Sequence, residues 1–194
     1  MPARAVLQGS DIERAITRIA HEILESDGQQ GSDPDGDPYL VLLGIPTRGV
    51  LLAERIAAVL ERIEPGSAIT GSLDVTMFRD DLRSQPTRTP SPTRLPTTGI
   101  DGATVVLVDD VLYSGRTIRA ALDALTHHGR PRVVRLAVLI DRGHRELPIR
   151  PDFVGKNLPS AASERVNLRL VETDGEDRVE IEQRTGEPHG GEGV

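Results

Sequence analysis

The sequence predicts an α/β fold with a mostly parallel central sheet flanked by helices, and three observations support this. Strands that are covered on both faces are indicated by apolar runs of strand length at residues 39–45, 105–108 and 133–140. Segments with the apolar spacing of helices lie between them, at 50–63 and 118–125. Such alternation is typical of parallel strands joined by right-handed crossovers. Ligands of these sheets bind beyond the carboxyl ends of the strands.

Further elements are predicted before, between and after these segments. Ser10 and Glu13 have the spacing of a capping box, and they precede a helix whose apolar stripe runs to Leu24. Residues 73–77 alternate between apolar and polar side chains, as a half-buried strand would. Residues 141–163 show no such period, so we expect them to be irregular.

The C-terminal part predicts a β-hairpin, with strands at 166–172 and 178–183 around an Asp-Gly turn. We expect residues 1–184 to form one domain, because this length suffices for a single core. Stretches rich in Gly, Pro, Ser and Asp predict flexible loops at about 27–38 and 81–100. A disordered tail is expected at 185–194.

Composition excludes several classes of site. The chain of 194 residues has no cysteine, so disulfides, thiolate nucleophiles and cysteine-based zinc sites are excluded. A net charge of −7 argues against sequence-blind nucleic-acid binding, and two Tyr and two Phe are too few for a base-stacking platform. No apolar run reaches the ~20 residues of a membrane helix. With no signal-type segment at the N-terminus, we expect a cytoplasmic protein.

The segment 105–117 carries the strongest functional signal. It predicts a buried strand, the carboxylates Asp109 and Asp110, a short loop and the start of a helix. A helix N-terminus preceded by such a loop binds anions, most often phosphate, and the loop's hydroxyl and glycine residues favour close approach. Two carboxylates at the strand end suit sugar hydroxyls, a magnesium ion or both. A sugar phosphate is therefore the ligand class that this segment favours.

A second strand, loop and helix carries Thr47, Arg48 and Gly49 in its loop. Two anion loops at the ends of two strands indicate a substrate with two phosphate groups. Taken alone, this short motif is also compatible with an ordinary loop.

These motifs resemble the type I phosphoribosyltransferases, and more specifically the PyrR family of bifunctional pyrimidine operon regulators and uracil phosphoribosyltransferases. The resemblance covers most of residues 10–172. It includes the run from Asp109 to Thr117, the loop 44–49, the segment 74–82 and the run DRGHRELPIR at 141–150. It implies the type I phosphoribosyltransferase fold, with a small hood beside the parallel sheet.

The resemblance also implies a reaction: uracil and phosphoribosyl pyrophosphate, with Mg²⁺, give UMP and pyrophosphate. Asp109, Asp110 and Arg48 would be catalytic, and the two aspartates would hold the ribose hydroxyls and are candidate contacts for the metal. The implied substrate-binding residues are Thr47, Arg48, Gly49, Arg79, Asp80, Asp109, Asp110, Val111, Leu112, Tyr113, Ser114, Gly115, Arg116, Thr117, Phe153 and Val154. Within this set, residues 113–117 would hold the 5′-phosphate, and Arg79 and Asp80 would begin a closing loop.

Some of these assignments carry alternatives. Phe153 would stack on uracil, although it fits a simple core aromatic nearly as well. The sequence also departs from the family pattern at Pro46, where many relatives carry lysine, and at Phe78, which replaces a common tyrosine.

The same resemblance implies a second activity, uridine-nucleotide-dependent binding to a stem-loop of pyr mRNA. A polar stripe with helical spacing and a basic group near residue 150 would form the RNA surface: Arg14, Thr17, Arg18, His21, Arg142, His144, Arg145, Arg150 and Lys156. Taken without the resemblance, the stripe is compatible with a solvated helix face. UMP and UTP would promote RNA binding, and a homodimer or higher homo-oligomer is expected.

Two other functions stay open at this point. The chain could be an RNA-binding regulator with vestigial catalysis, in which the nucleotide pocket acts as a sensor. It could also be a purine-salvage phosphoribosyltransferase that shares only the phosphate loops.

Overall fold

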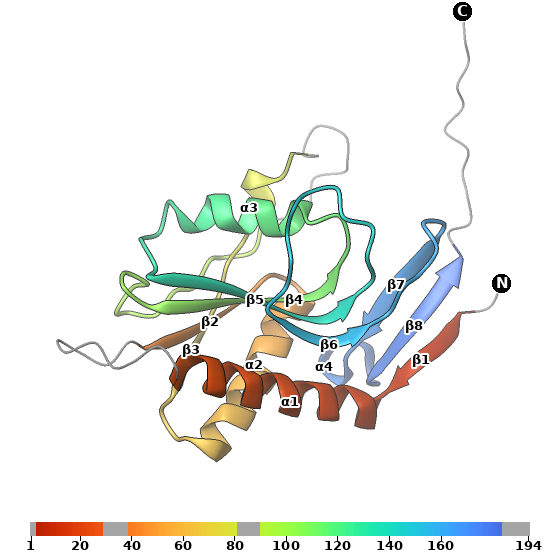
Figure 1. Cartoon of the computed structure of the whole chain (residues 1–194), viewed down its shortest axis with the longest axis horizontal. Helices are drawn as coiled ribbons and strands as arrows, with labels where there is room; N and C mark the ends of the chain where they lie inside the picture. Colours follow the sequence, from red (N-terminus) through yellow and green to blue (C-terminus); the bar gives the residue numbers. More distant parts are fainter. Residues whose placement is uncertain (1–2, 29–38, 81–89, 184–194) are drawn as a thin grey trace, which may run out of the picture.

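The computed structural model describes residues 3–28, 39–80 and 90–183. Its larger sheet has five parallel strands in the order β3-β2-β4-β5-β6 (Figure 1). In chain order they are β2 (Leu40–Gly44), β3 (Ala68–Ser72), β4 (Thr104–Leu112), β5 (Val133–Asp141) and β6 (Phe153–Asn157). The predicted α/β class with a parallel sheet is confirmed.

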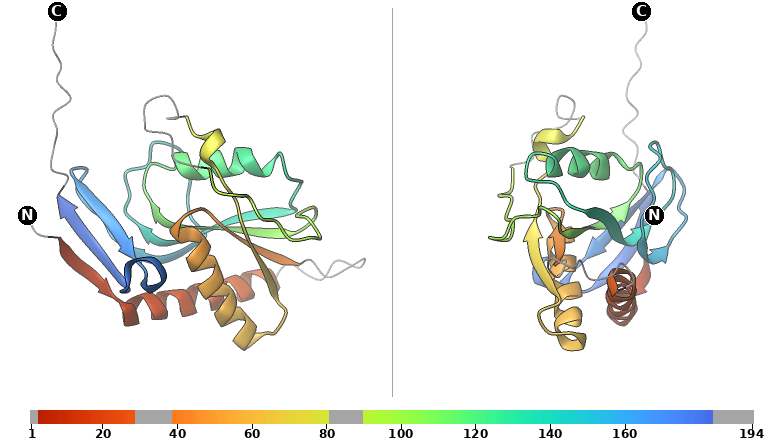
Figure 2. Two further views of the ribbon diagram at one scale, coloured as in Figure 1. Left: turned by 180° about the vertical axis from the view of Figure 1, so that it is seen from behind. Right: turned by 60° about the vertical axis from the view of Figure 1, so that its left-hand side comes forward.

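Helices cover both faces of this sheet, as Figures 1 and 2 show. The helices α1 (Gly9–Gly28) and α2 (Arg48–Ile63) pack on one face, and α3 (Arg116–Leu125) packs on the other. Alternate residues of each strand point to opposite faces, so Leu42 joins the core under α1 and α2 whereas Leu43 joins the core under α3. This explains why the strands appear in the sequence as continuous apolar runs.

A small antiparallel sheet lies at one end of the molecule, beside the carboxyl end of β4 (Figure 1). Its order is β1-β8-β7, formed by β1 (Arg4–Gln8), β7 (Glu164–Arg169) and β8 (Arg178–Gln183). The short helix α4 (Val171–Asp174) joins β7 to β8. This sheet is the expected hood, and its predicted C-terminal hairpin is confirmed.

Three local predictions were wrong. The strand expected at 73–77 is displaced, because β3 ends at Ser72 and residues 76–78 form the 3-10 turn η1 (Thr76–Phe78). The stretch 141–163 is not wholly irregular, because it contains the edge strand β6. The helix α1 is capped by Asp11, whose Oδ2 accepts the backbone N–H of Gln8 at 2.9 Å, two residues away from the predicted capping pair.

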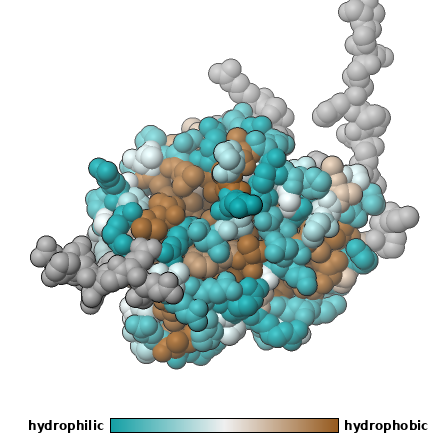
Figure 3. Space-filling model, in the orientation of Figure 1, coloured by the Kyte–Doolittle hydropathy of each residue, from teal (hydrophilic) through white to brown (hydrophobic). Residues whose placement is uncertain are grey.

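Most of the predicted loops and the whole tail lie outside the described residues. Of the loop at 81–100, residues 90–100 are described, and Arg94 exchanges two backbone hydrogen bonds of 2.8 Å with Ser72. Hydrophilic residues cover much of the face in Figure 3, with apolar patches between them. Within the described ranges, none of the helices is both long and apolar enough to cross a membrane.

Candidate active site

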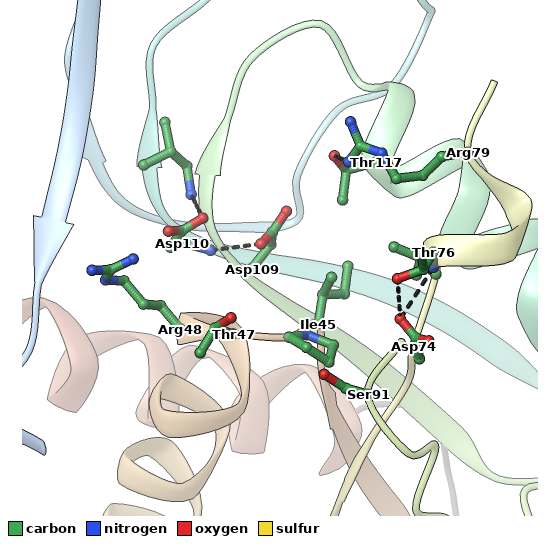
Figure 4. A pocket seen from close by; sticks show the side chains of 13 residues that line it. Ile45, Thr47, Arg48, Asp74, Thr76, Arg79, Ser91, Asp109, Asp110 and Thr117 are labelled. Carbon is green, nitrogen blue, oxygen red and sulfur yellow. Dashed lines mark hydrogen bonds between the residues drawn. The ribbon is translucent and has the colours of Figure 1, made fainter. Parts of the chain in front are cut away.

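A polar cleft of about 220 Å³ opens at the carboxyl ends of β2 and β4 (Figure 4). Its walls come from four segments that are distant in the sequence. The lining residues are Ile45, Pro46, Thr47, Arg48, Asp74, Val75, Thr76, Arg79, Ser91, Asp109, Asp110, Val111 and Thr117. The two motifs singled out in the sequence therefore meet in one cleft, at the edge where parallel sheets bind ligands.

Asp109 and Asp110 lie within the last residues of β4 rather than after it, because β4 pairs with β5 as far as Leu112. The Asp109 side chain is nearly buried, and its Oδ1 accepts the backbone N–H of Asp110 at 2.9 Å. Burial, and then the charge of Asp110, raises the pKa of Asp109 well above its ordinary value. Two crowded carboxylates favour a cation or a hydroxyl-rich ligand.

The turn before α3 has the geometry of an anion site. Gly115 has a φ of +91°, a conformation that favours glycine, and α3 begins directly after it. Thr117 lines the cleft, and Arg79 donates a 3.3 Å hydrogen bond to its Oγ1. Arg116 points elsewhere and pairs with Asp80 at 2.6 Å. Residues 113–116 thus shape the turn, and Thr117 and Arg79 face the cleft.

The loop after β2 lies tightly against β4. A Cβ on Gly49 would come 2.4 Å from the carbonyl oxygen of Val108, so only glycine fits at this position. The backbone N–H of Ile45 also donates to that oxygen, at 2.9 Å. The peptide bond between Pro46 and Thr47 is cis. This packing places the loop beside Asp109.

Arg48 links the cleft to the small sheet. Its Nη2 lies 3.0 and 3.1 Å from the two carboxylate oxygens of Asp174 in α4. The backbone N–H of Leu170, and then Thr173 and Arg48, lower the pKa of Asp174. Asp174 is therefore ionised, and an anion that binds Arg48 has to compete with it.

A second cavity, of about 450 Å³, lies between the cleft and the small sheet. It shares Arg48, Asp110 and Val111 with the cleft, and its remaining lining comes from Arg165, Val166, Asn167, Leu168, Arg169, Asp174 and Glu180. Sequence reasoning missed these residues, since β7 carries no motif and only the fold brings it opposite β4.

Comparison with known proteins agrees with this geometry. Residues 2–168 match the family model described as "Phosphoribosyl transferase domain". "Bifunctional protein PyrR" of Leifsonia xyli subsp. xyli is 65% identical over 94% of this chain and 98% of its own length. The protein of the same name from Streptomyces coelicolor is 59% identical over 96% of this chain and 93% of its own. The chain belongs to the PyrR family of type I phosphoribosyltransferases.

Solved structures give the same fold at low identity. A crystal structure of the hypoxanthine phosphoribosyltransferase of Trypanosoma cruzi has a TM-score of 0.69 and 19% identity, covering 93% of this chain and 96% of its own. At such identity the likeness shows the fold alone.

In this PyrR-family chain, Phe153 takes the second of its two predicted roles and lies in the core. It is only 5% exposed and belongs to the core under α1 and α2, so it lines neither cavity. Val154 is half-buried and packs on the opposite side of the sheet. The structure therefore favours the core-aromatic interpretation of Phe153, because residues of β6 lie one strand beyond β5 and away from the cleft.

The structure places α1, which carries the first basic group of this PyrR-family chain, beside β6, which carries Lys156 of the second group. Arg18 of α1 donates to the carbonyl oxygens of Val154 at 3.0 Å and Gly155 at 2.6 Å, which places it next to the exposed Lys156. Seven members of the predicted set are exposed: Arg14, Thr17, Arg18, His21, His144, Arg150 and Lys156.

The other two members of that set are not exposed. Arg142 is only 7% exposed and donates to the carbonyl oxygens of Ala161 and Glu164. Its inclusion in a contact surface was wrong, because its charge is used to close the loop before β7. Arg145 is half-buried, with an ion pair of 2.6 Å to Asp141.

The cleft also fits the Mg²⁺ that the PyrR resemblance implies. Magnesium is usually held by one or two carboxylates together with water and substrate phosphates, rather than by an all-protein cage. The described residues hold no group of three or more candidate ligands. Asp109 and Asp110 lie side by side at the cleft and would supply the carboxylates of such a shared site.

Proposed function

We propose that the chain is a uracil phosphoribosyltransferase that also regulates pyrimidine genes by binding their mRNA. The observation that carries the catalytic part is that the acidic pair and Arg48 share one cleft with Thr117, the last residue of the turn 113–117, here called the phosphate turn. This cleft continues into a cavity under the small sheet. The bifunctional proteins named PyrR, at 65% and 59% identity, support the choice of uracil and of pyrimidine control.

Each part of phosphoribosyl pyrophosphate finds matching chemistry. The turn at 113–117 would bind the 5′-phosphate through backbone N–H groups at the start of α3. Asp109 and Asp110 would hold the ribose 2′- and 3′-hydroxyls, and Arg48 would bind the pyrophosphate. The base would occupy the cavity lined by β7, which adjoins Asp110, in place of the predicted stacking on Phe153.

The reaction forms a bond between uracil N1 and ribose C1′ while the C1′–O bond to pyrophosphate breaks. The bond's electron pair leaves with pyrophosphate, and the N1 proton is released. Positive charge develops on the ribose, and the nearby carboxylates of Asp109 and Asp110 stabilise it. Arg48 holds the leaving group, and Mg²⁺, when bound, neutralises part of the pyrophosphate charge. Arg79 and Asp80 lead into the segment proposed to exclude water.

Pyrophosphate release tests this assignment directly. The protein is incubated with phosphoribosyl pyrophosphate and Mg²⁺, and uracil, hypoxanthine, guanine or orotate is offered separately. Release with uracil alone supports the proposal. Release with a purine alone identifies a salvage enzyme for purines. Release with none, combined with tight UMP binding, identifies a nucleotide-sensing regulator without catalysis.

Substitution of Arg48 by alanine is expected to raise the KM for phosphoribosyl pyrophosphate more than the KM for uracil. In the wild type, the guanidinium of Arg48 would contact pyrophosphate, and the variant lacks this contact. Charge-assisted hydrogen bonds of this kind contribute roughly 1.5–3 kcal/mol to binding. Steady-state kinetics with each substrate varied in turn measures the split. Arg62→Ala, on the exposed last turn of α2, is the matched control. Equal changes in the two KM values would contradict the assignment.

The RNA part of the proposal rests on the exposed predicted residues of α1, of the segment 141–150 and of β6. With few aromatic residues in the chain, arginine and hydroxyl contacts to a folded stem-loop would carry recognition. UMP and UTP bound in the cleft would promote RNA binding, and the RNA would in turn tighten nucleotide binding, since such coupling is reciprocal. A homodimer would extend the surface across two copies.

Arg18→Ala is expected to weaken stem-loop binding at least tenfold, on the scale of ~1–3 kcal/mol for a specific contact. Gel-shift titrations at several salt concentrations measure both the affinity and its salt dependence. Because Arg18 also binds the carbonyl oxygens of β6, thermal unfolding and uracil turnover of the variant are recorded as controls. An unchanged affinity with an unchanged salt slope would remove α1 from the RNA surface.

A further inference from the structure

The segment 141–150, which carries part of the predicted RNA set, lies directly behind the phosphate turn. The backbone N–H groups of Glu146 and Leu147 both donate to the carbonyl oxygen of Ser114, at 3.0 and 3.2 Å. The N–H of Arg142 donates to the carbonyl oxygen of Leu112 at 3.1 Å. These hydrogen bonds join the segment to the turn on both sides of Tyr113.

Side chains strengthen this attachment. A Cβ placed on Gly115 would lie 3.4–3.5 Å from side-chain atoms of Ile149 and Leu147, so these residues pack against the back of the turn. Glu146 pairs with Arg116 at 2.7 Å. Residues that do not line the cleft therefore support the turn from the segment 141–150.

Arg145 is the centre of that layer. Its Nε donates to Ile149 O at 3.0 Å, its Nη1 to Tyr113 O at 2.9 Å and Gly143 O at 3.2 Å, and its Nη2 to Asp141 at 2.6 Å. A guanidinium has five N–H groups, so four of them are used within the protein. With its side chain 22% exposed, Arg145 has little left to offer an RNA.

We propose that Arg145 is a positioning residue for the 5′-phosphate turn, an inference that rests on the phosphate role given to this turn in the proposed function. Its guanidinium fixes the carbonyl of Tyr113 and the path of the segment that binds Ser114, and thereby sets the direction of the N–H groups at the start of α3. The exposed His144 and Arg150 belong to the same segment, so the phosphate turn and the predicted RNA surface share one structural element.

The test uses Arg145→Lys and Arg145→Gln in the full chain. Lysine keeps the positive charge that an RNA contact needs, but one ammonium group cannot reproduce four fork-like hydrogen bonds. By calorimetry, we expect both variants to bind UMP roughly tenfold more weakly, which is the effect of losing one charge-assisted hydrogen bond. Their affinity for uridine, which lacks the 5′-phosphate, should be unchanged. The KM for phosphoribosyl pyrophosphate should rise, while the KM for uracil stays constant.

Arg135→Lys is the matched control, since Arg135 is also half-buried and hydrogen-bonded, to Ser26, but lies at the opposite end of β5. It should leave the ratio of UMP to uridine affinity unchanged. If Arg145→Gln does not fold, as judged by thermal unfolding, the lysine variant alone decides. An unchanged ratio in Arg145→Lys would overturn the proposal.

Failure of the proposed function is a separate result. If the wild-type protein releases no pyrophosphate with uracil, that assignment fails, whereas binding of phosphoribosyl pyrophosphate alone still reports on the turn. Weakened binding of that compound in both Arg145 variants, with Arg135→Lys unaffected, would then support the positioning role. Equal binding in all four proteins would refute it.

Discussion

Asp109→Asn is expected to give a protein that is more stable than the wild type and has lost most of its turnover. Burial and the charge of Asp110 raise the pKa of Asp109, so its ionised form is costly in the folded state. Asparagine removes that charge and can keep the acceptor for the N–H of Asp110. Loss of charge beside the developing ribose cation should lower kcat by roughly 10²–10³.

The stability gain should depend on pH. Because the folded-state pKa of Asp109 lies above its unfolded value, the folded wild type binds this proton more tightly, and its stability falls as pH rises from the unfolded pKa through the raised folded pKa. The stability of the asparagine variant does not fall with rising pH for this reason. The two proteins should therefore unfold at similar temperatures near the unfolded pKa of about 4, and the variant at the higher temperature well above it.

Thermal unfolding at both ends of this pH range, with steady-state turnover on the same samples, measures the two effects. A change of 1 kcal/mol corresponds to roughly 2–4 °C in a domain of this size. Asp110→Asn is the companion variant, expected to abolish UMP formation and also to relieve Asp109. A pH-independent stability difference would contradict the buried-charge explanation, and normal turnover would contradict the catalytic one.

Gly49→Ala is expected to lower activity by displacing the loop that holds Arg48. The added Cβ would lie 2.4 Å from a carbonyl oxygen of β4, and a backbone atom of a central strand cannot move aside without disturbing Asp109 next to it. Overpacking of this kind costs about 1–3 kcal/mol. The KM for phosphoribosyl pyrophosphate should rise at least tenfold together with a lower unfolding temperature.

Kinetics and thermal unfolding of a second glycine variant provide the control. A Cβ on Gly9 would meet only atoms of Asp177, the closest being its side-chain Cβ at 3.3 Å, so Gly9→Ala should be tolerated. If Gly49→Ala loses stability but retains the wild-type KM, the close approach is structural and the loop does not bind pyrophosphate. Unchanged behaviour in both assays would show that the loop can shift freely.

The centre of the parallel sheet could be predicted because three of its strands carry their own signal. The strands β2, β4 and β5 are largely buried on both faces, and their apolar runs show this without reference to the rest of the chain. By contrast, β6 is a five-residue edge strand containing Gly155, and its identity depends on pairing with β5. Leu73 and Val75 gave a strand pattern because both are buried, although they lie beyond the end of β3.

Prediction of the site was limited in the same way. The phosphate turn and the acidic pair are contiguous in the sequence, so their proposed role followed from local chemistry. The cavity at Arg165 and Asn167 is created by two strands about 55 residues apart in the sequence, and none of its β7 residues forms a motif. Likewise, sequence shows that Arg142 is basic, and only the fold shows that it is buried.

The pairing of β1 with β8 has a consequence for how the molecule assembles. Gln8 lies opposite Arg178, so the small sheet needs contacts between residues about 170 positions apart, whereas the parallel sheet grows through neighbouring units. During synthesis the central sheet can form before β8, the partner of β1, has been made. The cleft at Asp109 and Asp110 would then exist before the small sheet closes the second cavity, so the proposed base site would be the last part of the site to form.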